Sequence, residues 1–269
     1  MTQSEPGAGL QPDKPNAARM FDYYLGGKDN FAADRAAAAA VLQVAPWMPE
    51  AARQGRGLIA RTVRHLVQER GIRQILDLGS GLPTQDNVHE IAHRIDPEVR
   101  VVYVDDDPVV CAHGRALLAD AKTVTVVQAD LRQPEQVLGH PEITAALDFD
   151  SPVAILMMFV LHLVPDDQDP QRIVATYRDG LAPGSYLALS HASTDVHPDL
   201  MSRISAIYER ANSPFVPRSH ADISDFFGDF VLEPPGLVNM WPYTEPPSTE
   251  DPDVARTGYS GVGCKPQRS

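Results

Sequence analysis

The segment that most constrains the fold is ILDLGSGLPT, residues 75–84. Its apolar run around Asp77 is typical of a buried parallel strand, and Gly79 and Gly81 let the backbone turn sharply where a Cβ atom would not be tolerated. Apolar residues then recur at helical spacing over residues 88–95. The pattern predicts a strand, a glycine turn and a helix, an arrangement that lets a nucleotide-like ligand approach the backbone. A glycine-rich turn that binds nothing is the alternative.

Two further strands are expected to bring acids to the same edge of the sheet. Residues 101–104 indicate a strand that ends at Asp105, 24 residues after Gly81, and residues 124–127 lead to Asp130. The first spacing is close to that at which a doubly wound fold places an acid on a ribose hydroxyl. Each acid alone suits an ordinary helix cap or turn. Three strands that end in phase on an acid instead predict a ligand site.

The rest of the chain continues the α/β alternation and then departs from it. Residues 152–159 form a continuous apolar run, as in a central strand covered on both faces, and residues 186–190 indicate the next strand. Strand-like segments then follow at residues 231–233, 238–241 and 259–265. A dehydrogenase would continue with βαβ units here, whereas closing strands joined by a loop favour an antiparallel hairpin. We predict a doubly wound, Rossmann-like α/β sheet that is mostly parallel, with an antiparallel C-terminal hairpin.

The N-terminal part is expected to be helical. Helices are predicted over residues 16–24 and about 50–69, and Asp29 or Asn30 is expected to cap a helix between them. Several arginines of the long helix are expected to face mostly outward: Arg53, Arg56, Arg61, Arg64 and Arg70. The predicted organisation is a disordered tail, a helical cap and a ligand-binding domain, at residues 1–14, 15–70 and 71–269.

Composition excludes some classes of partner. The 269 residues carry a formal net charge of −13 and no basic stripe, so a nucleic-acid substrate is disfavoured. Cys111 and Cys264 are far apart and neither lies in a C-x-x-C motif, which fits a reducing cytoplasm. No run of about 18 apolar residues suggests a membrane segment. We expect a soluble cytoplasmic protein.

Three motifs, LDLGSGLPT, YVDDDP and VQADLR, resemble the cofactor-binding motifs of the seven-stranded S-adenosylmethionine-dependent methyltransferases. The resemblance implies that Gly79 and Gly81 lie under the methionyl part and that Asp105 binds the ribose hydroxyls. It also implies that Asp130 and Leu131 lie at the adenine. Asp77 and Asp106 are the other residues of these motifs that are expected to bind the cofactor. Pro83 is a departure, because that superfamily often has a third glycine there.

A narrower resemblance covers nearly the whole chain. The stretches PNAARMFDYYLGGKDNFAADR and SGVGCKP are similar to a bacterial family of S-adenosyl methyltransferases whose label supplies no substrate. Polar and aromatic residues crowd around the break at residues 26–27, so we expect residues 16–34 to form a lid over the cofactor, with Arg19 and Tyr23 near its polar end. The alternative is that this segment packs on the edge of the sheet.

The sequence assigns no catalytic residue, because an in-line methyl transfer can proceed by positioning alone. His162 and His191 follow strand ends and are candidate bases, as is Tyr23, although a packing role suits each of them. An acidic loop at residues 166–169 suits Mg²⁺ or, alternatively, a solvated turn, and we predict no metal site.

The predicted function is therefore S-adenosylmethionine-dependent methyl transfer to an oxygen or nitrogen atom of a small molecule. The alternative is a protein that binds S-adenosylmethionine or S-adenosylhomocysteine without catalysis, as a sensor or a partner-binding module. A nicotinamide-dependent oxidoreductase is opposed by Thr84, which replaces the third glycine of G-x-G-x-x-G, and by the hairpin-like C-terminus. The acceptor and the oligomeric state are left open.

Overall fold

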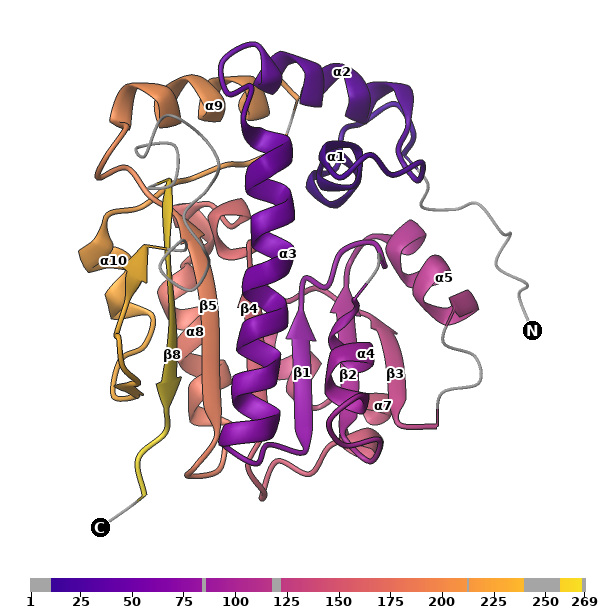
Figure 1. Ribbon diagram of the computed structural model, residues 1–269, viewed down its shortest axis with the longest axis vertical. Helices are drawn as coiled ribbons and strands as arrows, with labels where there is room; N and C mark the ends of the chain where they lie inside the picture. Colours follow the sequence, from indigo (N-terminus) through magenta and orange to yellow (C-terminus); the bar gives the residue numbers. More distant parts are fainter. Residues whose placement is uncertain (1–10, 84–85, 118–121, 212, 240–256, 268–269) are drawn as a thin grey trace.

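A computed structural model describes residues 11–83, 86–117, 122–211, 213–239 and 257–267. Within these residues, one sheet has the strand order β3-β2-β1-β4-β5-β8-β6, and β7 pairs with β8 (Figure 1). The strands are β1 (Gln74–Leu78), β2 (Arg100–Asp105), β3 (Val124–Gln128), β4 (Ala154–Met158), β5 (Tyr186–Ala192), β6 (Val231–Leu232), β7 (Val238–Asn239) and β8 (Gly258–Cys264). The predicted loop that joins the closing strands, at residues 242–252, lies outside the described residues.

The sheet is parallel from β3 to β5 and antiparallel at β8. Leu78 is in register with Val104, and Asp105 is in register with Gln128, so the carboxyl ends of β1, β2 and β3 meet at one edge. β8 runs antiparallel to β5 and also to β6 and β7. Figure 1 shows the parallel strands pointing toward the end of the molecule where α1, α2 and α9 lie. The predicted fold class is confirmed.

Helices cover both faces of the sheet because successive strand residues point to opposite sides. The helices are α1 (Ala17–Tyr24), α2 (Ala32–Leu42), α3 (Met48–Arg64), α4 (Val88–His93), α5 (Pro108–Leu117), α6 (Pro134–Leu138), α7 (Pro141–Ala146), α8 (Pro170–Asp179), α9 (Pro198–Arg210) and α10 (His220–Asp225). In β4, Leu156 packs with residues of α3 and α4, whereas Ile155 packs with residues of α6, α7 and α8. No helix of the described residues has both the length and the apolar character needed to cross a membrane.

A separate apolar cluster joins the N-terminal helices to a later part of the chain. Met20 and Tyr24 of α1 and Val41 of α2 are buried against Ile204 and Tyr208 of α9. The long helix α3 contributes Ala52 to the same cluster, packs on the sheet farther along and continues into a π-helical turn, His65–Glu69. The cluster therefore places α1 and α2 over the carboxyl ends of the strands, with α9 beside them (Figure 1).

Local details of the helices differ from the prediction in three places. Phe31, and not Asp29 or Asn30, is the N-cap of α2, because the Asp34 carboxylate accepts the Phe31 amide hydrogen at 2.7 Å. Helix α4 ends at His93, so Ile95 lies beyond it and is 36% exposed. The sequence analysis did not predict α7. The other expected helices are confirmed within a few residues of their ends.

Candidate active site

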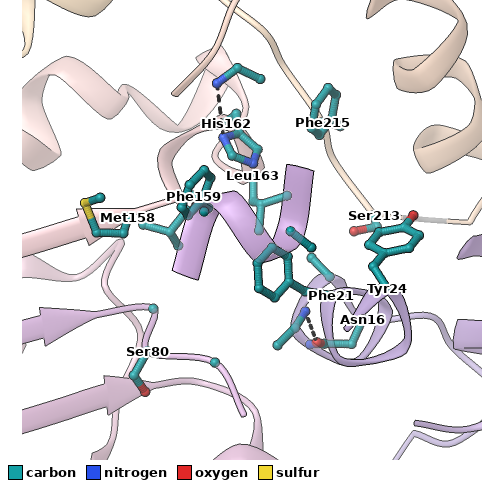
Figure 2. Close-up of a pocket in the computed structure, with 18 of the residues that line it drawn as sticks. Asn16, Phe21, Tyr24, Ser80, Met158, Phe159, His162, Leu163, Ser213 and Phe215 are labelled. Carbon is teal, nitrogen blue, oxygen red and sulfur yellow. Dashed lines mark hydrogen bonds between the residues drawn. The ribbon is translucent and has the colours of Figure 1, made fainter. Parts of the chain in front are cut away.

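A cavity of about 460 Å³ lies between the carboxyl ends of the parallel strands and α1. Figure 2 shows Ser80 on one side of it and Tyr24 and Phe215 on the other. We call the part lined by the turns after β1, β2 and β3 the glycine end: Gly79, Ser80, Gly81, Asp105, Asp106, Asp130 and Leu131. We call the part lined by α1, α9 and their neighbours the aromatic end: Phe21, Tyr24, Trp47, Phe159, His162, Tyr208 and Phe215.

The glycine turn is held against the end of β2. Gly79 and Gly81 have φ of 73° and 67°, values that side-chain-bearing residues rarely adopt. The Gly79 amide donates to the Val104 carbonyl at 2.8 Å, and a Cβ atom on Gly79 would lie 2.4 Å from the Val160 side chain. A Cβ atom on Gly81 would meet only Ala18, at 3.9 Å, and so would occupy cavity space between the turn and α1. Both predicted glycines therefore line the cavity.

Asp105 lines the same end and is tied to the turn. One carboxylate oxygen accepts the Gly81 amide hydrogen at 2.9 Å, and the other accepts the Asp107 amide hydrogen at 3.0 Å. Burial raises the pKa of Asp105 to about 6, although these two hydrogen bonds act in the opposite direction. The arrangement presents a fixed acceptor to a ligand with hydroxyl groups.

Asp77 lies beneath the cavity and not on its lining. It is 7% exposed, and burial raises its pKa to about 7, with Arg56 opposing the rise and Asp105 adding to it. Arg56 of α3 lines the cavity and donates to the Asp86 carbonyl at 2.9 Å. Burial lowers the pKa of Arg56, while Asp77 acts in the opposite direction. The predicted acid is thus one layer below the surface that a ligand would touch.

Arg56 was expected to face solvent with the other arginines of the long helix, but it lines the cavity. Arg53 and Arg64 are exposed, whereas Arg56 is half-buried and reaches the cavity. A signal was present, because Arg56 precedes Ile59 by three residues and Val63 by seven, and so falls on the apolar stripe.

The other acids of the glycine end are clustered with an arginine. Arg132 donates to Asp130 at 2.7 Å and to Asp106 at 3.5 Å. Burial would raise the pKa of Asp130, but hydrogen bonds from Arg132 lower it overall. Leu131 lines the cavity beside them, and its carbonyl accepts from the Tyr177 hydroxyl at 2.9 Å. The structure therefore brings Asp106, Asp130 and Leu131 together with Asp105, the four predicted residues of the second and third turns.

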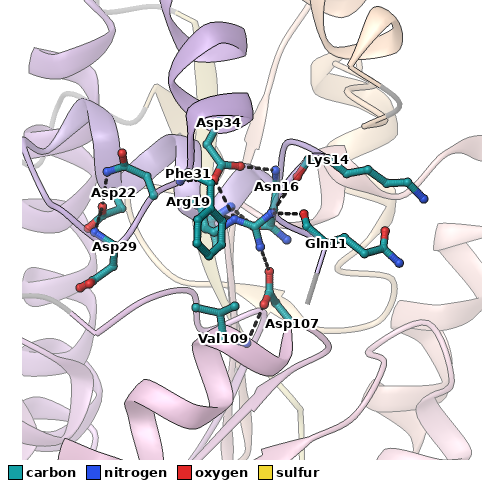
Figure 3. A network of polar contacts seen from close by, with 12 residues as sticks. Gln11, Lys14, Asn16, Arg19, Asp22, Asp29, Phe31, Asp34, Asp107 and Val109 are labelled. Carbon is teal, nitrogen blue, oxygen red and sulfur yellow. Dashed lines mark hydrogen bonds and ion pairs between the residues drawn. The ribbon is translucent and has the colours of Figure 1, made fainter. Parts of the chain in front are cut away.

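Arg19 and Tyr23 do not line the cavity. Arg19 is 3% exposed and lies between two carboxylates, with Nε 2.9 Å from Asp34 and Nη1 2.6 Å from Asp107 (Figure 3). Its Nη2 atom also donates to the Lys14 carbonyl at 2.8 Å, so the described end of the predicted tail is held against α1. The residues of α1 that do line the cavity include Phe21 and Tyr24.

Aromatic rings line the other end of the cavity. The Phe215 ring lies 4.9 Å from the Tyr208 ring and 5.1 Å from the His162 ring, and the Phe21 ring stacks 6.2 Å from that of Phe159 (Figure 2). Phe159 directly follows β4 and has a φ of 60°, a strained value for a residue with a side chain. Phe159 lines the cavity, whereas Asp86 and Asp169, which also have positive φ, do not.

The two candidate histidines differ in position. His162 lines the cavity, and its Nδ1 atom accepts the Ala192 amide hydrogen at 3.5 Å, so the neutral ring carries its proton on Nε2. Burial lowers the pKa of His162 well below its usual value. His191 is fully buried off the cavity, with Nδ1 2.7 Å from the Ala192 carbonyl and Nε2 2.9 Å from Arg218. His191 is therefore a packing residue here.

The acidic loop after β4 has other partners. Asp166 pairs with Arg218 at 2.6 Å, and Asp169 caps α8 by accepting the Arg172 amide hydrogen at 3.1 Å. Across the described ranges of the chain, no group of three or more histidine, cysteine or acidic side chains is placed to hold a metal ion.

Comparison with known proteins connects this geometry to a family. A family model described as S-adenosyl methyltransferase matches residues 3–266. A putative methyltransferase from Thermobifida fusca is 42% identical, with a TM-score of 0.90 and 97% of this chain and 99% of that chain covered. A DUF574 family protein from Streptomyces avermitilis is 37% identical, with a TM-score of 0.90 and coverages of 95% and 100%.

A more distant structure shares the fold. The N-methyltransferase NodS from Bradyrhizobium japonicum, solved in complex with S-adenosyl-L-homocysteine, is 12% identical, with a TM-score of 0.51 and coverages of 94% of this chain and 100% of that chain. No curated protein matches the sequence.

Proposed function

The chain belongs to the S-adenosyl methyltransferase family and uses S-adenosylmethionine, and we propose that it transfers the methyl group to an oxygen or nitrogen atom of a small molecule. One observation carries the proposal: a single cavity joins an acid-lined glycine turn to a separate aromatic end, so a donor and an acceptor have adjoining places. The family match gives no support to the alternative of a non-catalytic sensor.

The residues of the glycine end fit the cofactor. Asp105 offers a half-buried carboxylate to the ribose hydroxyls, and Gly81 leaves space that any side chain would fill. We place Gly79 and Gly81 along the methionyl part, and Asp130 with Leu131 at the adenine, with Asp106 beside them. Asp77 lies below this surface and does not touch the ligand.

Arg56 is the residue that we add to this set. Two arginines line the cavity in the described ranges: Arg132, which pairs with Asp130, and Arg56, which donates to the Asp86 carbonyl. Arg56 approaches from α3 and lies near Asp77. A half-buried guanidinium at this place suits the carboxylate of the methionyl part, because charge-assisted hydrogen bonds are strong where water is restricted.

The aromatic end positions an acceptor and offers it no strong base. When bound, S-adenosylmethionine would supply an electrophilic methyl group to the acceptor atom. His162 carries its proton on the nitrogen not engaged by Ala192, and burial raises the pKa of Tyr208 to about 12. We infer that rate acceleration comes from alignment and from exclusion of water. The acceptor proton then leaves to solvent.

We also propose that the N-terminal helices form the roof over the donor and the acceptor. Ala18 of α1 faces the glycine turn, while Phe21 and Tyr24 face the aromatic end. Arg19 anchors this helix to the turn after β2 and does not contact the cofactor. We therefore keep the predicted position of the lid over the cofactor and assign Arg19 an anchoring role in place of cofactor contact.

The setting that we propose is the cytoplasm, with a small-molecule acceptor and no nucleic acid. The formal net charge of −13 opposes binding to a phosphate backbone, and the cavity is the size of a small-molecule site.

Calorimetry with the full chain tests the proposal. S-adenosylmethionine and S-adenosylhomocysteine are expected to bind with micromolar-range affinity, and NAD is expected not to bind. Incubation with methyl-labelled cofactor and a metabolite extract is expected to transfer label to a small molecule. NAD binding without binding of either sulfur ligand would contradict the proposal, and cofactor binding without any transfer would favour the sensor.

A further inference from the structure

His162 is held in place at the aromatic end of the cavity. It lies in the short 3₁₀ turn that follows β4. Arg218 donates to the Leu161 carbonyl at 3.1 Å and to the Val164 carbonyl at 2.8 Å, so the backbone is bound on both sides of the histidine. The His162 carbonyl itself accepts the Val216 amide hydrogen at 2.7 Å. The backbone that carries this ring is therefore fixed by tertiary hydrogen bonds and not by the turn alone.

One nitrogen of the His162 ring is open to the cavity. The residue is 9% exposed, and its Nδ1 atom accepts the Ala192 amide hydrogen on one side of the ring (Figure 2). The Nε2 atom lies on the opposite side and has no hydrogen-bond partner among the described residues. Unlike the Tyr24 hydroxyl, it is not enclosed by protein. Buried polar groups are nearly always paired, so this nitrogen indicates a partner bound in the cavity.

The open nitrogen is a hydrogen-bond donor. Because Nδ1 accepts, the neutral ring carries its hydrogen on Nε2. Burial lowers the pKa of His162 well below its usual value, and His191 and Arg218 act in the same direction, so the ring is neutral at pH 7.5. A protonated Nε2 has no lone pair with which to remove a proton from the acceptor. His162 can instead donate a hydrogen bond, and the atom that receives it must carry a lone pair.

The walls around this donor are apolar and largely aromatic. The Phe215 ring lies 5.1 Å from the His162 ring, and Phe21 and Phe159 line the same end of the cavity. Figure 2 shows Phe159, Leu163 and Phe215 around His162. Aromatic walls favour a planar ring, which gains both contact area and the edge or offset geometry that aromatic pairs prefer.

We propose that His162 selects the methyl acceptor by donating its Nε2–H to a lone-pair atom, a ring nitrogen or a carbonyl oxygen, of an aromatic ring compound. This inference rests on the proposed function and adds the chemical class of the acceptor. In this role His162 orients the acceptor and does not remove its proton.

The test uses the full chain saturated with S-adenosylhomocysteine, whose own binding is measured first. Naphthalene, quinoline and isoquinoline are then titrated at pH 7.5 by equilibrium dialysis. The probes share one shape, and the last two replace a C–H group by a neutral ring nitrogen at two different places. The readout is the affinity of the better-bound nitrogen probe divided by that of naphthalene, because damage to the apolar walls changes both affinities alike.

His162→Phe keeps an aromatic ring and removes the N–H group. We expect the ratio to fall about three- to tenfold, with the binding of naphthalene and of S-adenosylhomocysteine unchanged. His162→Gln carries an amide whose N–H can reach a similar place, and it is expected to restore the parent ratio to within about twofold. The control is His113→Phe, the same exchange on α5 away from the cavity lining, which should leave the ratio at the parent value.

An unchanged ratio in folded His162→Phe would overturn the proposal, as would an equal fall in His113→Phe. A fall in His162→Gln as large as that in His162→Phe would show a packing effect of the ring and would overturn it too, as would failure of both nitrogen probes to bind the parent. If His162→Phe does not fold, His162→Leu takes its place. In each of these cases binding of S-adenosylhomocysteine would leave the proposed function standing, whereas absence of that binding in the parent chain would count against the function itself.

Discussion

Arg19 and Asp107 form a buried ion pair, with Nη1 2.6 Å from the carboxylate, although 88 residues separate them in the chain. The pair connects α1 to the turn after β2, and the Asp107 amide in turn donates to Asp105. Arg19 also holds Asp34 at 2.9 Å, so one guanidinium joins α1, α2 and the cofactor-binding edge (Figure 3). The roof of the cavity is thereby attached to the residue that we place on the ribose.

Replacing this guanidinium should therefore weaken both the fold and the cofactor site. Arg19→Met leaves two buried carboxylates without their cation, and we expect a loss of about 3 kcal/mol in the free energy of unfolding, measured in urea. Cofactor affinity should also fall. Arg53→Met is the control, because Arg53 pairs with Glu50 at the surface and should contribute at most about 1 kcal/mol. Equal effects of the two substitutions would show that the buried pair does not anchor α1.

Asp105→Ala should weaken S-adenosylhomocysteine binding by about 1.5 to 3 kcal/mol, the range for hydrogen bonds to a charged group. Calorimetry measures the change, and circular dichroism checks the fold. Asp179→Ala removes an exposed carboxylate at the end of α8 and should leave the affinity unaltered. An unchanged dissociation constant in folded Asp105→Ala would remove this residue from the site.

The role of Arg56 can be separated from that of the ribose site with a shortened ligand. Arg56→Gln should weaken S-adenosylhomocysteine binding about tenfold, a loss of about 1.4 kcal/mol, and should leave binding of 5′-methylthioadenosine unchanged, because that ligand lacks the amino-acid carboxylate. Arg64→Gln, on the exposed side of the same helix, is the matched control. Equal losses for both ligands would mean that Arg56 supports the site without contacting the carboxylate.

The stability of the ligand-free protein should depend on pH through Asp77. Its pKa rises from 3.8 to about 7 on folding, so the folded chain retains a proton that the unfolded chain loses between these values. The contribution of Asp77 to the free energy of unfolding is therefore highest below pH 4 and falls as the pH rises toward 7.

Urea unfolding of Asp77→Asn and the parent measures this effect. Relative to the parent, the variant should gain about 4 kcal/mol in unfolding free energy between pH 4 and pH 8. Asp167→Asn, in the exposed acidic loop, should follow the parent at both values. A constant difference between Asp77→Asn and the parent would show that Asp77 does not titrate in this range.

The fold class and the residues of the glycine end follow from local patterns in the sequence. Gly79 and Gly81 indicate a turn, because few other residues tolerate their backbone angles. Asp105 and Asp130 each lie just after an apolar run. Parallel strands deliver such residues to one edge without further information, because their carboxyl ends are aligned. The fold class and the gathering of these residues at one edge of the sheet therefore needed no tertiary contacts.

The aromatic end and the anchoring of α1 were decided by the tertiary structure alone. Tyr24 lies beside Tyr208 only because α1 and α9 share an apolar cluster, and nothing in either helix specifies the other. Arg19 was expected at the cofactor but is neutralised by Asp34 and Asp107, and Arg56 was expected in solvent but lies on the cavity. A side chain's spacing in the sequence determines the face of its element, whereas its partner depends on packing between distant segments, which no local pattern contains.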